Sequence, residues 1–134
     1  MKMKGLLMFA VALMFAACTN THNSTEHIEL NEGQKWIVNA EMKPYIEQGR
    51  ELLNAYLSQA DTDNKNLATK LQEQNSKLIR SCTMDGKSHD ELHKWLLPHL
   101  QLVKQLSDAE TPDEVTKVTD KLKASYDLYD KHFE

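Results

Sequence analysis

The sequence is poor in residues that interrupt helices and in residues that cross-link a fold. Its 134 residues contain 4 glycines, 3 prolines and 2 cysteines. Because glycine and proline are scarce and no stretch alternates apolar with polar residues, the chain favours long helices over a β-sheet. Its longest apolar run, residues 5–17, is too short to span a bilayer, which takes about 20 residues. No C-x-x-C-H segment is present, which excludes covalent attachment of a c-type haem.

The first 18 residues have the composition of a secretory signal. Two lysines in Met1–Lys4 precede the apolar run, which ends in small residues directly before Cys18. This ending resembles the lipobox of bacterial lipoproteins, and the resemblance implies that residues 1–17 are removed and that Cys18 is lipidated. Thr19–Asn20 lack the aspartate that resembles an inner-membrane retention signal. We therefore expect a lipid-anchored protein of the cell envelope, on the outer membrane and facing the periplasm.

The remaining chain is acidic and of single-domain size. Removing residues 1–17 leaves 117 residues with 14 basic and 20 acidic side chains, a net charge of −6. Scattered lysines in an acidic chain argue against nucleic acid as a partner, so contact with the membrane is expected through the lipid alone. Residues 18–38 are mostly polar and are predicted to form a tether. Its last part, Trp36–Val38, is expected to dock against a domain of residues 39–134.

Apolar residues recur at helical spacing in four segments of that domain. The first is expected at about residues 41–60, with Gly49 on its inner face where a neighbouring helix approaches closely. The second is expected to end near Cys82. A capping box of Ser88 with Glu91 would start the third, and a second box, Thr111–Glu114, would start the fourth. Short connections make consecutive helices antiparallel neighbours, so the sequence predicts an all-α, up-down-up-down four-helix bundle.

One group of residues points to chemistry. His89 and His93 are four residues apart and therefore share a helix face. A loop of five residues separates Cys82 from the next helix and would bring its thiol to the same end of the bundle. With Cys18 committed to lipid, Cys82 is left without a disulfide partner in an oxidising compartment. We therefore predict a transition-metal site of Cys82, His89 and His93, with Met84, Met42 or His132 as the fourth ligand.

The ligand types leave several hypotheses open. Methionine with cysteine and histidine favours copper, whereas a carboxylate or His132 as fourth ligand favours zinc. Non-covalent haem between the helices is a further alternative. His89–His93 has the two-histidine spacing of zinc peptidases but carries Asp90 at the position of the general base, so no enzymatic activity is expected. The competing hypothesis is a ligand-free interaction or structural module of the envelope.

The segment from Cys82 to Leu100 also resembles a family of small secreted or lipid-anchored helical proteins of Bacteroidota-type bacteria. Their recurrent pattern is C-x-M-x-G-x-x-H-D-x-L-H. The matching residues here are Cys82, Met84, Gly86, His89, Asp90, Leu92 and His93. No activity comes with this resemblance, and it favours only the interpretation that the grouping of these residues is more than chance.

Overall fold

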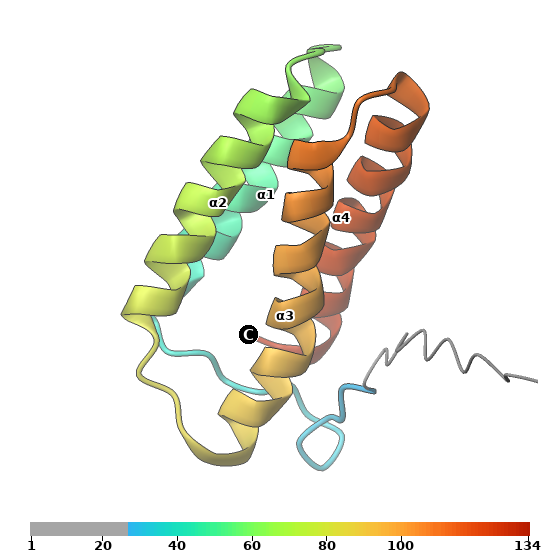
Figure 1. The fold of residues 1–134 in the computed structure, drawn as a ribbon. Coiled ribbons are helices and arrows are strands. Elements are labelled where there is room, and N and C mark those ends of the chain that lie inside the picture. The colour runs from blue at the N-terminus through green and yellow to red at the C-terminus, as the bar shows by residue number, and fades with distance from the viewer. Residues whose placement is uncertain (1–26) are drawn as a thin grey trace, which may run out of the picture.

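A computed structural model describes residues 27–134, and this part of the chain forms a bundle of four helices (Figure 1). The helices are α1 (Lys43–Ser58), α2 (Asn64–Ser81), α3 (Gly86–Asp108) and α4 (Pro112–His132). The prediction of an all-α four-helix bundle is confirmed. The predicted signal, the lipidation site Cys18 and the start of the tether lie outside the described residues.

Local signals set most of the helix starts. Pro44 lies in the first turn of α1, and Asp63 caps α2 by accepting a hydrogen bond from the Asn66 amide at 2.9 Å. The capping box that begins α4 forms as predicted. In it Thr111 Oγ1 accepts from the Glu114 amide at 3.2 Å, and Glu114 Oε2 accepts from the Thr111 amide at 3.1 Å. These caps satisfy amides that have no partner within the helix.

The start of α3 differs from the prediction. The helix begins at Gly86, two residues before Ser88, and the predicted capping box does not form. Gly86 has a φ of +62°, a left-handed conformation that glycine adopts without strain. Glu91 is 3% exposed and accepts instead from the Glu29 amide at 2.8 Å, while its other carboxylate oxygen contacts Lys94 Nζ. The carboxylate that was predicted to cap α3 therefore binds the N-terminal segment instead.

That N-terminal segment is part of the folded unit and is not a tether over residues 28–38. Ile28, Trp36 and Val38 are buried against the helices, which confirms the predicted docking near residue 36 but begins it at least eight residues earlier. Trp36 pairs in parallel with Phe133 after the end of α4. Three backbone hydrogen bonds hold this pairing: Trp36 to His132, Glu134 to Trp36, and Val38 to Glu134. The burial of Ile28 was not predicted, because a single isoleucine among polar residues gives no periodic apolar pattern.

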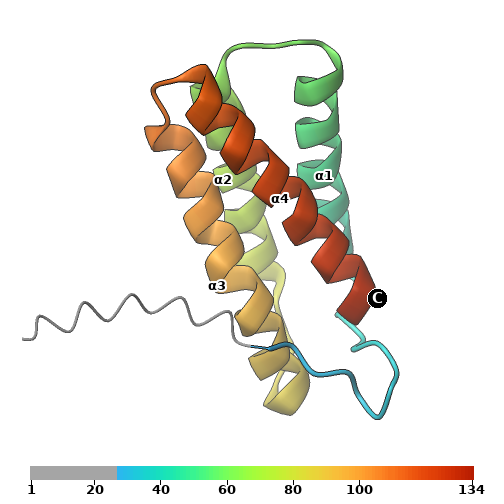
Figure 2. The same ribbon diagram turned by 90° about the vertical axis from the view of Figure 1, so that its right-hand side faces the viewer.

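In the middle of the core, the Tyr126 side chain of α4 reaches the face of α1 that carries Gly49. Gly49 is buried in α1, and a Cβ built on it would overlap the hydroxyl oxygen of Tyr126 in α4. Gly49 is therefore on the inner face as predicted, but the space beside it is filled by the Tyr126 side chain and not by a closely approaching helix. Toward the other end the two helices diverge, because α4 crosses the bundle at an angle (Figure 2). The bundle is thus closed near the N-terminal segment and opens between α1 and α4 at the loops of residues 59–63 and 109–111.

Candidate functional site

The first turns of α3 hold the two predicted histidine ligands next to each other. The ring centroids of His89 and His93 are 4.3 Å apart, with an angle of 58° between the ring planes. His89 is half-buried and His93 is exposed. The spacing of four residues places both imidazoles on one face of the helix. The pair can present two nitrogen ligands to one ion from the solvent side.

The two sulfur-bearing residues lie in the α2–α3 junction, residues 82–85. Cys82 and Met84 are both half-buried and pack against the hydrophobic core. The carboxamide of Asn39 holds this junction: its Nδ2 donates to the Ser81 carbonyl at 3.0 Å, and its Oδ1 accepts from the Thr83 amide at 3.1 Å. These two bonds bracket Cys82. Sequence reasoning missed Asn39, because its partners Ser81 and Thr83 lie 42 and 44 residues away in sequence.

The predicted convergence of Cys82 with both histidines is not present. Within residues 27–134, no three histidine, cysteine, aspartate or glutamate side chains are grouped so that they could hold a metal ion. Cys82 leaves α2 in an extended conformation and turns its side chain to the core, whereas His93 is exposed. The junction as described offers two imidazoles side by side and two sulfur atoms on the neighbouring loop.

The proposed fourth ligands from other helices also have structural roles. His132 is 7% exposed, and its Nδ1 lies 2.9 Å from the Leu128 carbonyl oxygen one turn earlier in α4. Its own carbonyl accepts from the Trp36 amide, which ties α4 to the N-terminal segment. Met42 is fully buried in the core. Of the sulfur and nitrogen donors considered, Met84 alone shares the junction with Cys82.

Another histidine, His99, lies in the core. It is 0% exposed, and its Nδ1 is 2.9 Å from the hydroxyl of Ser125. Its ring stacks on Trp95 at 4.8 Å and meets the edge of Tyr126 at 4.9 Å. Its Nε2 has no hydrogen-bond partner among the described side chains and backbone. Burial disfavours the imidazolium and lowers the pKa of His99 to about 4.

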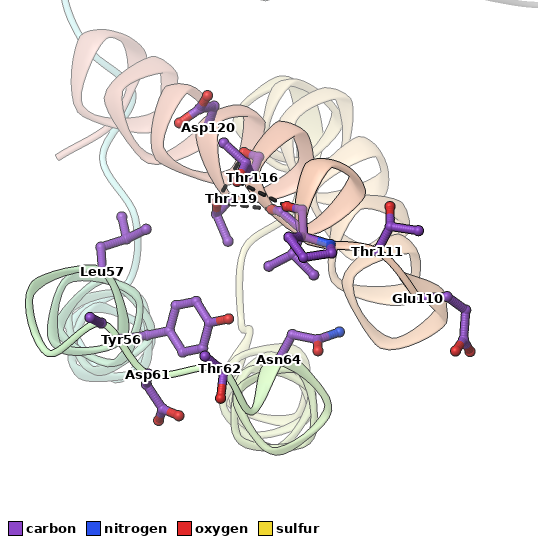
Figure 3. A pocket seen from close by; sticks show the side chains of 13 residues that line it. Tyr56, Leu57, Asp61, Thr62, Asn64, Glu110, Thr111, Thr116, Thr119 and Asp120 are labelled. Atoms are coloured by element: carbon purple, nitrogen blue, oxygen red, sulfur yellow. Dashed lines mark hydrogen bonds between the residues drawn. The ribbon is translucent and has the colours of Figure 1, made fainter.

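A groove lies at the other end of the bundle, between α1 and α4. Its volume is about 370 Å³. Tyr56 and Leu57 of α1 form one wall, and Val115 and Thr119 of α4 form the other (Figure 3). We call it the α1–α4 groove. The sequence gave no indication of it, because it arises from the angle at which α4 crosses the bundle.

No protein-family model, curated protein or solved structure matches this chain. Within the described part, none of the helices combines the length and the apolar character needed to cross a bilayer.

Proposed function

We propose that this chain is a lipid-anchored envelope protein that binds one transition-metal ion at the α2–α3 junction. The observation that carries the proposal is the contact between the His89 and His93 rings, with centroids 4.3 Å apart. The anchor is Cys18, and the compartment is the periplasmic face of the outer membrane. The proposed role is metal handling or sensing, because the residues of the proposed site would act as metal ligands and none is assigned a catalytic role.

The neighbouring loop supports the choice of a soft metal. Cys82 and Met84 stand in the four residues between α2 and α3, and both are only half-buried. Thiolate and thioether sulfur with imidazole nitrogen suit Cu(I), and the same thiolate with two imidazoles suits Zn(II). Binding with all four donors requires the loop to turn Cys82 away from the core. The two hydrogen bonds from Asn39 are the contacts that would have to adjust.

The experiment is a competition titration with Cu(I) and Zn(II) against a coloured chelator. It uses the chain with Cys18→Ser, so that Cys82 is the single thiol. We expect one ion per chain, and about a tenfold or greater loss of affinity in His89→Ala and in Cys82→Ser, as one lost ligand contributes more than about 1.4 kcal/mol.

The control is His27→Ala. His27 is exposed, and its backbone carbonyl accepts from Lys94, on a different face of α3 from the histidine pair. Equal, weak binding by all of these proteins would contradict the metal proposal. A haem absorption band that appears on addition of haemin and is lost in a histidine variant would support the haem alternative in its place.

The anchor is tested separately in a bacterial host with lipoprotein processing. We expect the wild-type chain to fractionate with the outer membrane and to carry acyl chains on Cys18, since two or more chains give stable anchoring. Cys18→Ser should move to the soluble envelope fraction. Retention of the Cys18→Ser protein in the membrane would contradict anchoring by lipid.

The α1–α4 groove favours a second candidate function, an envelope module that acts by binding through this groove without any metal. The two functions are distinguishable because the groove and the α2–α3 junction lie at opposite ends of the bundle (Figure 1).

A further inference from the structure

The α1–α4 groove is open because its two walls belong to helices that diverge. Figure 2 shows α4 crossing from the α1 side of the bundle toward α3 as it approaches its N-terminus. Leu57 is left 44% exposed on the α1 wall, and Val115 is half-buried on the α4 wall. Tyr56 closes the base between them (Figure 3). A volume of about 370 Å³ with apolar walls is of the size that small organic ligands occupy.

Three of the polar side chains that line the groove already donate their hydrogens to backbone carbonyls. Thr116 Oγ1 donates to the Pro112 carbonyl at 2.9 Å, and Thr119 Oγ1 is 3.0 Å from the Val115 carbonyl. Both hydrogens of the Asn64 carboxamide are committed as well. They are donated to the carbonyls of Leu106 and Ala109, at 2.9 and 3.2 Å. These three side chains therefore offer a ligand lone pairs and no further donors.

The rim carries negative charge on three sides. Asp61, Glu110 and Asp120 line the groove, and no lysine, arginine or histidine does. Figure 3 shows the three carboxylates at separate edges of the groove, each directed away from the interior that Tyr56 and the α4 side chains form. Lys65 reaches Glu110 at 3.3 Å, but both side chains are largely exposed and screened by water. Burial first, and then the charges of Asp61 and Asp63, raise the pKa of Tyr56.

We propose that the α1–α4 groove binds an aliphatic amine, with its hydrocarbon chain between Leu57 and Val115 and its ammonium group at the acidic rim. An ammonium is a donor of three hydrogen bonds with no acceptor, which matches walls that supply lone pairs. An apolar stem with a charged end in water also matches an apolar interior beneath a charged mouth. The inference is independent of the metal site, which lies at the opposite end of the bundle.

The test compares three probes that share one six-carbon chain: hexylammonium, hexanol and hexanoate. Each is titrated into the isotope-labelled Cys18→Ser chain and followed by the amide resonances of the protein. We expect hexylammonium to bind most tightly, with shifts confined to the groove residues, and to weaken when salt is raised to about 0.5 M. Hexanoate should bind most weakly because the rim repels it.

Two variants with matched controls separate the rim from the wall. Asp120→Asn should weaken hexylammonium by about two- to fivefold, and Asp127→Asn, an exposed aspartate of the same helix outside the groove, should not. Thr116→Val removes one acceptor and should cost about two- to tenfold. Its control is Thr69→Val in α2, because Thr69 makes the same bond to a carbonyl four residues earlier, at 3.0 Å.

Four results would overturn the inference. Hexanol or hexanoate binding as tightly as hexylammonium would show that charge and donors play no part. Shifts spread outside the groove would show non-specific association. If Thr116→Val and Thr69→Val bind hexylammonium equally well, and thermal unfolding shows that both are folded, Thr116 does not contact the ligand. The fourth result concerns a blocked lysine, N-acetyl-lysinamide. If it binds more tightly than hexylammonium, the occupant is a lysine of a protein partner and not a free amine.

Discussion

Acid should destabilise this protein earlier than its carboxyl groups alone would require, because of His99. The imidazole is 0% exposed, between Trp95 and Tyr126, and only its Nδ1 has a hydrogen-bond partner, the Ser125 hydroxyl. Burial lowers the pKa of His99 from 6.5 to about 4. In the unfolded chain the same imidazole is solvated and keeps its ordinary pKa.

The direction of the effect follows from which state binds the proton. Between pH 6.5 and 4 the unfolded chain binds a proton at residue 99 and the folded chain does not, so stability falls as the pH falls through this window. One pKa unit corresponds to about 1.4 kcal/mol, so a shift of this size removes about 3 kcal/mol by pH 4. About 2 kcal/mol of this is lost between pH 7.5 and pH 5. Carboxyl groups, with ordinary pKa values of about 4, contribute mainly below this window.

The assay is urea unfolding of wild type, His99→Leu and His27→Leu across this pH range. Leucine fills the same space without a titrating group, so the His99→Leu protein should lose about 2 kcal/mol less than wild type between pH 7.5 and 5. The exposed control His27→Leu should keep the wild-type slope. Parallel pH profiles for wild type and His99→Leu, or a His99 resonance that titrates near 6.5 in the folded protein, would refute the reasoning.

Three further perturbations test the fold and the junction. Gly49→Ala should lower the free energy of unfolding by about 1–3 kcal/mol, because the new methyl group meets the Tyr126 hydroxyl. Adding Tyr126→Phe should recover part of this loss in thermal unfolding, and additive effects of the two substitutions would contradict the contact. Asn39→Ala should speed the reaction of Cys82 with a thiol reagent by about five- to a hundredfold as two hydrogen bonds are lost, and an unchanged rate would show that Asn39 does not hold the junction closed. Thr111→Ala should cost about 0.5–2 kcal/mol in urea unfolding, and a smaller loss would mean that the capping box is not formed in solution.

The bundle was predictable because its determinants are local and repeated. Apolar residues at helical spacing define all four helices, and the Thr111–Glu114 box depends on residues within one turn. The equivalent box at Ser88 failed because Glu91 contacts Glu29, which lies 62 residues away in sequence. A local sequence pattern cannot indicate that the Glu29 amide binds the carboxylate of Glu91. The same holds for Ile28, whose burial depends on helices that follow it.

The candidate sites were predictable in smaller part. Helical spacing alone is enough to bring His89 and His93 together, and the structure has them in contact. The position of Cys82 depends on the conformation of a loop and on its hydrogen bonds with Asn39, which spacing does not determine. The α1–α4 groove depends on the angle at which α4 crosses the bundle, which no motif in the sequence indicates.

The metal proposal is tested most directly by X-ray absorption at the metal edge of the loaded Cys18→Ser chain. With Zn(II), we predict a shell of nitrogen at about 2.0 Å and sulfur at about 2.3 Å. The nitrogen contribution should fall in the double variant His89→Ala with His93→Ala, and the sulfur contribution should disappear in Cys82→Ser. A shell without sulfur, or a spectrum that is the same in wild type and in the double histidine variant, would contradict a metal site at the α2–α3 junction.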